Sequence, residues 1–98
     1  MLSPAGPAAA DTIPKGMLDA DEARCKRGCL VNNHEPVCAF LCRCTVQRFA
    51  TALDLEAYLA LTIEMRDGTI SPAARQFLDE TARTCAAEWD AQTKDAGP

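Results

Sequence analysis

Apolar residues recur every three or four positions in four stretches of the chain, a spacing that predicts α-helices. Polar turns rich in asparagine, proline, glycine or serine separate these stretches. No stretch alternates apolar and polar residues for long enough to predict a sheet. The pattern therefore predicts an all-α fold, a compact four-helix domain with helices at about residues 20–31, from Pro36 onward, at residues 53–65 and at residues 72–91.

Residues that favour helix ends support these boundaries. Asp19, with Glu22 three positions later, resembles a capping box at the start of the first helix. Asp67–Gly68 is expected to end the third helix. The later helices start with a proline or a capping side chain, namely Pro36, Asp54 and the pair Ser71–Pro72.

The apolar positions also predict which helix faces are buried. The third helix is apolar nearly all round and offers more apolar surface than one buried stripe requires. The second and fourth helices have a single apolar stripe each. These stripes are Val37, Cys38, Leu41, Cys42, Thr45 and Phe49 on the second helix, and Ala74, Phe77, Leu78, Thr81, Ala82, Cys85 and Trp89 on the fourth.

Five of the six cysteines lie between residues 25 and 44, and four of these five form two C-x3-C motifs. Residues four apart on a helix share one face, so an antiparallel hairpin that turns at residues 32–36 would bring the two motifs together. Six cysteines allow 15 connectivities, and the sequence does not choose among them. Our hypothesis is a disulfide-stapled helical hairpin with the pairs Cys25–Cys42 and Cys29–Cys38, and Cys44–Cys85 as the remaining pair.

The doubled C-x3-C is similar to the twin-motif helical hairpins of small intermembrane-space chaperones and of some plant and venom peptides. The resemblance covers residues 25–42 and implies the same pairing geometry. It implies no function, because Cys44, Cys85 and the two later helices lie outside it. Gly28 lies between the cysteines of the first motif, and we attribute it to a close approach of the partner helix.

The two ends of the chain are expected to lie outside the folded domain. Residues 1–17 are rich in proline and alanine and have no apolar period, which predicts a flexible arm. Ala8-Ala9-Ala10 fits the small residues before a signal-peptidase cut, so a signal-peptide remnant is the alternative, although no basic region or long apolar run precedes it. We assign residues 18–93 to a single helical, disulfide-rich domain and residues 94–98 to a polar tail.

Composition indicates the type of compartment and argues against some classes of partner. A chain of 98 residues has a small core, and an even, high number of cysteines favours an oxidising setting, periplasmic or secreted. The net charge of −4 argues against a nucleic-acid binder. The charge is uneven, with six basic and five acidic residues before position 52 and four basic and nine acidic residues after it. No window of 18 residues is apolar, so we expect no membrane span.

Two kinds of cysteine chemistry remain as alternatives. The first is thiol–disulfide redox chemistry at Cys42-Arg43-Cys44, although the C-x-x-C motif of such enzymes is absent from the sequence. The second is binding of Cu(I) or Zn(II) by helical cysteines, with His34 near the turn. The sequence carries no nucleophile elbow, phosphate loop or haem-attachment motif. We therefore predict no enzymatic activity, no cofactor and no metal site.

Our leading hypothesis is a small protein that binds a protein partner, as an accessory subunit, an inhibitor or immunity protein, or a chaperone. We place the docking patch on the outer side of the third helix, at Leu61 and Met65, rimmed by Glu64 and Arg66. The alternative is that the third helix is the central one and is covered by the hairpin and by Phe77, Leu78 and Trp89. The sequence does not indicate the oligomeric state.

Overall fold

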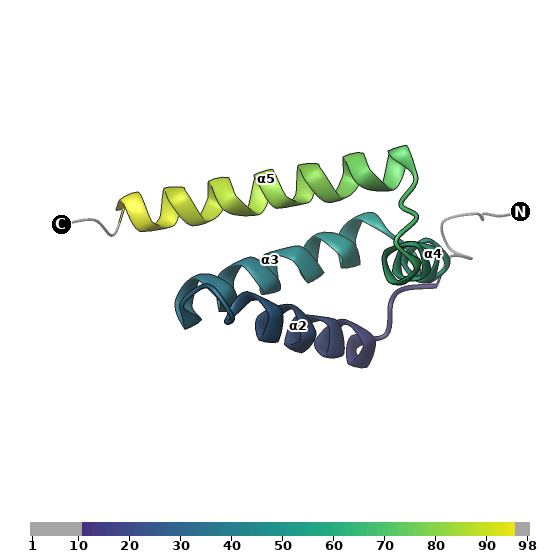
Figure 1. Cartoon of the computed structure of the whole chain (residues 1–98), viewed down its shortest axis with the longest axis horizontal. Coiled ribbons are helices and arrows are strands. Elements are labelled where there is room, and N and C mark those ends of the chain that lie inside the picture. The colour runs from purple at the N-terminus through teal and green to yellow at the C-terminus, as the bar shows by residue number, and fades with distance from the viewer. Residues whose placement is uncertain (1–10, 96–98) are drawn as a thin grey trace, which may run out of the picture.

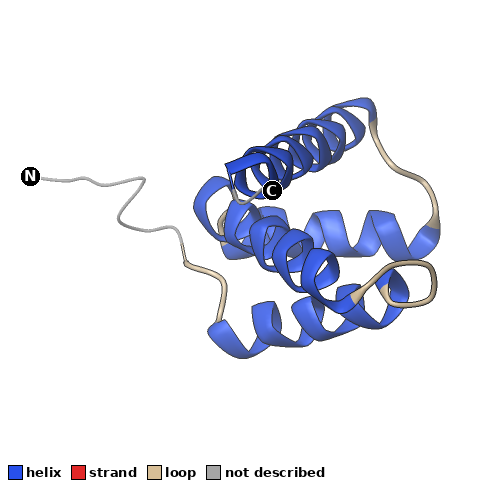
Figure 2. Cartoon of the chain, turned by 90° about the vertical axis from the view of Figure 1, so that its left-hand side faces the viewer, coloured by secondary structure: helices blue, strands red, loops and turns tan. Residues whose placement is uncertain are grey.

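The computed structural model describes residues 11–95, which form four helices and no strand. The predicted all-α, four-helix fold is confirmed for this part of the chain. The helices are α2 (Lys15–Cys29), α3 (Glu35–Ala52), α4 (Leu55–Asp67) and α5 (Pro72–Asp95), and loops join them in sequence (Figures 1 and 2).

Helix α3 occupies the centre of the molecule. Helix α2 lies along one side of it and α5 along the other, and both run antiparallel to it (Figure 1). Helix α4 lies across one end of these three helices and is seen end-on in Figure 1. The sequence offered the third predicted helix, now α4, as a possible central helix. The central helix is instead the second one, α3, which carries cysteines on two sides and is bonded to both neighbours.

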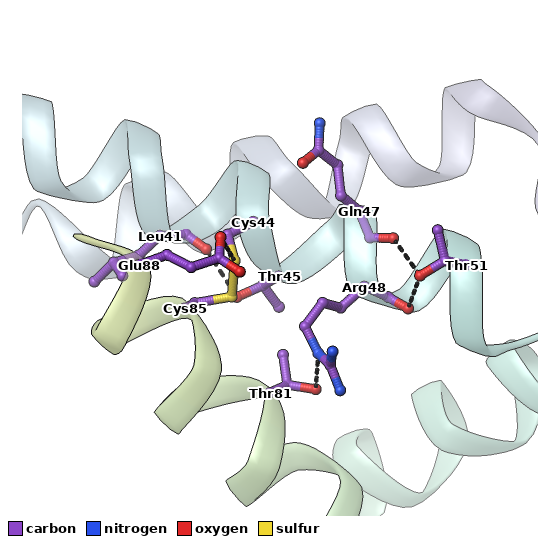
Figure 3. The surroundings of a disulfide bond; sticks show 9 residues. All are labelled: Leu41, Cys44, Thr45, Gln47, Arg48, Thr51, Thr81, Cys85 and Glu88. Atoms are coloured by element: carbon purple, nitrogen blue, oxygen red, sulfur yellow. Dashed lines mark hydrogen bonds between the residues drawn. A yellow bond between two sulfur atoms is a disulfide. The ribbon is translucent and has the colours of Figure 1, made fainter. Parts of the chain in front are cut away.

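The disulfides follow the predicted pairing, Cys25–Cys42, Cys29–Cys38 and Cys44–Cys85. The first two join α2 to α3 and form the stapled hairpin, with Cα atoms 5.7 and 5.6 Å apart. Because Cys44 is two residues beyond Cys42, it points about 200° round the helix. It therefore reaches α5 on the opposite side of α3 (Figure 3).

Helix α2 begins at Lys15, five residues before the expected start at residue 20. Pro14 has φ −59° and ψ 140°, and its carbonyl accepts hydrogen bonds from Met17 N (3.1 Å) and Leu18 N (3.3 Å). A proline fixes φ near the helical value and needs no hydrogen-bond partner for its nitrogen. The predicted capping box is wrong, because Asp19 lies inside the helix and pairs with Lys15 Nζ at 2.8 Å.

Residues 11–17, which the sequence assigned to the flexible arm, belong to the folded domain. Ile13 is 7 % exposed and lies in the core with Phe49, Tyr58 and Leu61. The carbonyl of Asp11 accepts a hydrogen bond from the first residue of α4 at 2.8 Å. Residues 1–10, with the possible cleavage signal, and residues 96–98 of the predicted tail lie outside the described residues.

The other helix ends follow the predicted capping residues. Pro36 lies in the first turn of α3, and Asp54 caps α4 by accepting a hydrogen bond from Ala57 N at 2.8 Å. Gly68 ends α4 in the left-handed conformation, with φ 77°. Ser71 Oγ accepts a hydrogen bond from the first turn of α5 at 3.2 Å.

Aromatic side chains pack at both ends of α3. At the α4 end, the Phe49 ring lies 6.2 Å from Tyr58 and 5.9 Å from Phe77, measured between centroids. At the hairpin end, Phe40 and Trp89 have centroids 5.4 Å apart. Trp89 therefore does not cover α4 as expected. The predicted apolar face of α5 otherwise holds, except that Ala82 is exposed.

Between these ends, α3 and α5 meet around the third disulfide (Figure 3). Thr81 is 2 % exposed, and its hydroxyl accepts a hydrogen bond from Arg48 Nε at 3.3 Å. The carboxylate of Glu88 lies 3.8 Å from the sulfur of Cys44. Between the aromatic contacts at its two ends, this interface is thus closed by a covalent bond and a polar contact.

Candidate functional site

An apolar groove of about 660 Å³ opens between α2, α3 and α4. Its floor comes from α3 and α5, and its walls come from α2 and α4. The lining residues are Asp21, Arg24 and Cys25 of α2, Thr45, Val46 and Phe49 of α3, Tyr58, Leu61, Thr62, Met65 and Arg66 of α4, and Leu78 of α5.

The α4 wall is anchored at one end and open at the other. Tyr58, Leu61 and Met65 follow the spacing of one helix face. Tyr58 and Leu61 are 2 % and 6 % exposed, whereas Met65, one turn further along, is 48 % exposed. The last turns of α4 therefore leave apolar surface uncovered, and this surface is one side of the groove.

The α2 wall is held by covalent bonds. No residue of α2 is fully buried, although Met17 and Leu18 in its first turn pack against the core. Cys25 lines the groove and is bonded to Cys42, which is fully buried in α3. The disulfide therefore holds the α2 wall at a fixed distance from the floor.

The polar groups of the groove divide into hydroxyls and charges. Thr45 and Thr62 donate hydrogen bonds to backbone carbonyls of their own helices, at 2.8 and 2.9 Å, so their hydroxyls need no ligand. Arg24 pairs with Asp21 on the same helix. Arg66 pairs through Nε with Asp67 at 3.3 Å. The guanidinium groups are mostly exposed, which places them at the mouth of the groove.

The residues of the docking patch predicted on the third helix differ in their burial and in their contacts. Leu61 is a core residue and not an outer one, because it shares the inward face of α4 with Tyr58. Met65 and Arg66 line the mouth of the groove. The Glu64 carboxylate accepts a hydrogen bond from Ser71 N at 2.8 Å, which ties it to the turn before α5.

A second apolar surface lies on the outer side of α4, away from the groove. Leu59 and Ile63 are 41 % and 50 % exposed and are one turn apart. Neither of them lines the groove. The sequence indicated that α4 has more apolar surface than the core needs, but it did not show which of its residues remain outside. No local signal indicated that α2 and α4 line the same groove.

The cysteines have no free sulfur in this structure. All six are in disulfides, so none of them is a thiolate that could bind Cu(I) or Zn(II). Cys42 and Cys44 are bonded to different partners and do not form the strained C-x-C bridge of the redox alternative. His34 is exposed at the start of α3. Within residues 11–95, no three histidine, cysteine or acidic side chains gather as a metal site would require.

A shifted pKa is found at Lys15, on the surface and away from the groove. The hydrogen bond and the charge of Asp19 raise the pKa of the Lys15 amino group, which is fully exposed at the start of α2. Its raised pKa is a property of one surface pair and carries no indication of catalysis.

Comparisons with protein-family models, curated proteins and solved structures gave no match. None of the helices in the described part of the chain has the length and apolar character needed to cross a membrane. The three disulfides are consistent with an oxidising, extracytoplasmic compartment.

Proposed function

We propose that this protein is a non-catalytic binding module of the periplasm or the extracellular space, and that it holds the apolar part of a small guest molecule in the groove. The observation that carries the proposal is the groove itself. Its volume of about 660 Å³ lies within the range of roughly 300–1,000 Å³ that is typical of small-molecule sites. Such sites are mostly apolar with a few polar groups, as this one is.

The way the walls are held supports the same proposal. The Cys25–Cys42 disulfide fixes α2 against α3, and Tyr58 and Leu61 fix α4 against the core. A groove that is already formed loses little conformational freedom when a guest enters, and this favours affinity. The threonine hydroxyls of the groove are bonded within their own helices, an arrangement that suits binding and not nucleophilic chemistry.

Protein–protein binding is a second candidate function, and it belongs to a different surface. The exposed side chains of Leu59 and Ile63 favour it, since apolar residues one turn apart on a helix are typical anchors for a partner. The surface that we propose for a protein partner is therefore the outer side of α4, beside the groove but outside it.

The test is binding of Nile red, a neutral dye whose fluorescence increases in apolar surroundings. We expect saturable binding to the wild type and at least tenfold weaker binding to Met65→Asp, because a carboxylate at the groove must lose water when the dye enters. Ile63→Asp is the matched control. It introduces the same charge on the same helix at almost the same exposure, 50 % against 48 %, but outside the groove.

The two variants separate the candidates. Loss of dye binding in Met65→Asp with retention in Ile63→Asp supports the groove as the guest site. Equal loss in both variants, or no saturable binding to the wild type, overturns the groove proposal. Far-UV circular dichroism of both variants confirms that the helices are retained.

A further inference from the structure

We infer that the guest of the groove is a single-chain aliphatic anion, such as a fatty carboxylate, with its chain over the apolar floor and its head group at Arg24 and Arg66. The inference rests on the proposed function and specifies the chemistry of the guest. It combines the apolar lining with the charges at the mouth of the groove.

The first step of the argument is the shape of the site. Phe49 and Leu78 supply aromatic and aliphatic surface at the floor and Leu61 adds to it from the α4 wall, while the two arginines of the lining are exposed at the mouth. A guest that fits both regions has an apolar body and one polar end. A wholly apolar guest would leave the mouth unused, and a wholly polar guest would lose its hydration against the floor.

The second step concerns the charged residues that line the groove. Two of the three charged residues that line the groove are arginines, and they come from two walls, Arg24 from α2 and Arg66 from α4. The carboxylate, Asp21, is bonded to Arg24 Nη1. Asp67 pairs likewise with Arg66, so each arginine has one carboxylate beside it and the four groups carry no net charge. The guanidinium N–H groups that remain free can only donate hydrogen bonds, which favours an anionic head group, a strong acceptor, over a cationic one.

The third step is the hydrogen-bonding capacity of the arginines. A guanidinium has five N–H donors. Arg66 uses Nε for its contact with Asp67, so its terminal nitrogens are available. A carboxylate matches the planar fork of an arginine better than it matches other cations. The adjacent residues Cys25 and Met65 line the groove, so both guanidinium groups are attached directly beside the apolar surface.

The experiment measures displacement of Nile red from the wild-type protein by three amphiphiles with the same chain, dodecanoate, dodecanol and dodecyltrimethylammonium, each below its micelle concentration. We expect dodecanoate to displace the dye at concentrations at least tenfold lower than dodecyltrimethylammonium, with dodecanol between them. The preference should weaken as salt increases, because the arginines are exposed and their charge is screened.

The double variant Arg24→Gln/Arg66→Gln identifies the source of the preference. We expect the ratio between dodecanoate and dodecyltrimethylammonium to fall to threefold or less, with dye affinity within about twofold of the wild type. Arg75→Gln/Arg83→Gln is the matched control, since it removes the same charge from exposed positions of α5 outside the groove. This variant should keep the tenfold preference.

The outcomes separate this inference from the proposed function. If Nile red does not bind the wild type, the guest site is overturned and this inference falls with it. If the dye binds but the three amphiphiles displace it equally, or if both double variants lose the preference equally, the groove stands as a guest site and the anionic guest is overturned. Co-sedimentation of the wild type with anionic but not with zwitterionic phospholipid vesicles, lost in Arg24→Gln/Arg66→Gln, would assign the arginines to a membrane surface, which also contradicts a free amphiphile.

Discussion

Gly28 lies inside α2 and Gly68 directly follows α4, and the two glycines differ in their backbone constraints. A Cβ atom added at Gly28 would meet no atom within 4 Å, and this residue has ordinary helical geometry in α2. Gly68 ends α4 with φ 77°, where a side chain is strained whatever the space around it. The close approach inferred for Gly28 from the sequence is therefore wrong. Gly28 is one position before Cys29, about 100° away from the face that meets α3.

We predict that replacement by alanine has opposite effects on the free energy of unfolding at these two glycines. Gly28→Ala should raise the free energy of unfolding by about 0.5–1 kcal/mol, because alanine is the better helix former and nothing obstructs its methyl group. Gly68→Ala should lower it by about 1–2 kcal/mol, because alanine is strained at positive φ. Urea unfolding followed by circular dichroism, with the disulfides intact, measures both values. A loss of stability in Gly28→Ala would contradict the open surroundings described for this position.

Helix α4, which forms one wall of the groove, is fixed by a segment that has no regular secondary structure. Residues 11–14 precede α2, yet Ile13 lies in the core with residues of α3 and α4. The Asp11 carbonyl accepts a hydrogen bond from Leu55 N at 2.8 Å, at the first residue of α4. The segment thus connects the start of α2 to the start of α4, and its contacts hold α4, the groove wall, in place.

We predict that Ile13→Ala lowers the free energy of unfolding by roughly 2–5 kcal/mol, the usual range for loss of a buried isoleucine side chain. It should also weaken Nile red binding, because α4 loses part of its support. Thr12→Ala is the control, since Thr12 is exposed one position earlier. Thermal unfolding and dye titration of the two variants provide the measurement. Near-wild-type stability of Ile13→Ala would show that the segment does not brace α4.

In the molecule as a whole, three disulfides link α2, α3 and α5. The α2 helix buries no residue, and the α3–α5 contact is centred on a disulfide. The bridges differ in the length of chain that they close. Cys44–Cys85 spans 41 residues, whereas Cys29–Cys38 spans 9. In the chain-entropy account, a longer closed loop gives a larger stabilisation because it restricts the unfolded chain more.

We therefore predict that Cys44→Ser/Cys85→Ser destabilises the protein by roughly 4 kcal/mol and Cys29→Ser/Cys38→Ser by roughly 2.6 kcal/mol. Both variants remove one bridge with at least one fully or almost fully buried sulfur, so they form a matched pair. Circular dichroism should therefore give a larger drop in melting temperature for Cys44→Ser/Cys85→Ser than for Cys29→Ser/Cys38→Ser. Complete reduction of the wild type should lower its melting temperature by more than about ten degrees. An unchanged melt after reduction would show that the disulfides do not stabilise this fold.

The sequence by itself determined the number of helices in residues 11–95 and their approximate bounds, and it suggested the disulfide pairing that the structure confirms. These features depend on local relations. A period of 3.6 residues predicts a helix, and a proline, an Asp54 cap or a Gly68 terminus sets its end. Two C-x3-C motifs on facing helices align because residues four apart share a face. The short turn between them made the hairpin the simplest arrangement.

The tertiary structure alone decided which apolar residues meet. Leu61 and Met65 belong to the same nearly all-apolar helix, and the sequence did not show that one is buried while the other stands at the mouth of a groove. That difference depends on the angle at which α4 crosses the end of the bundle. Ile13 was likewise assigned to the arm, because its burial arises from contacts with residues more than 30 positions away. Helical periodicity reports the face of a helix, whereas the groove is formed by the spacing between helices that are distant in the sequence.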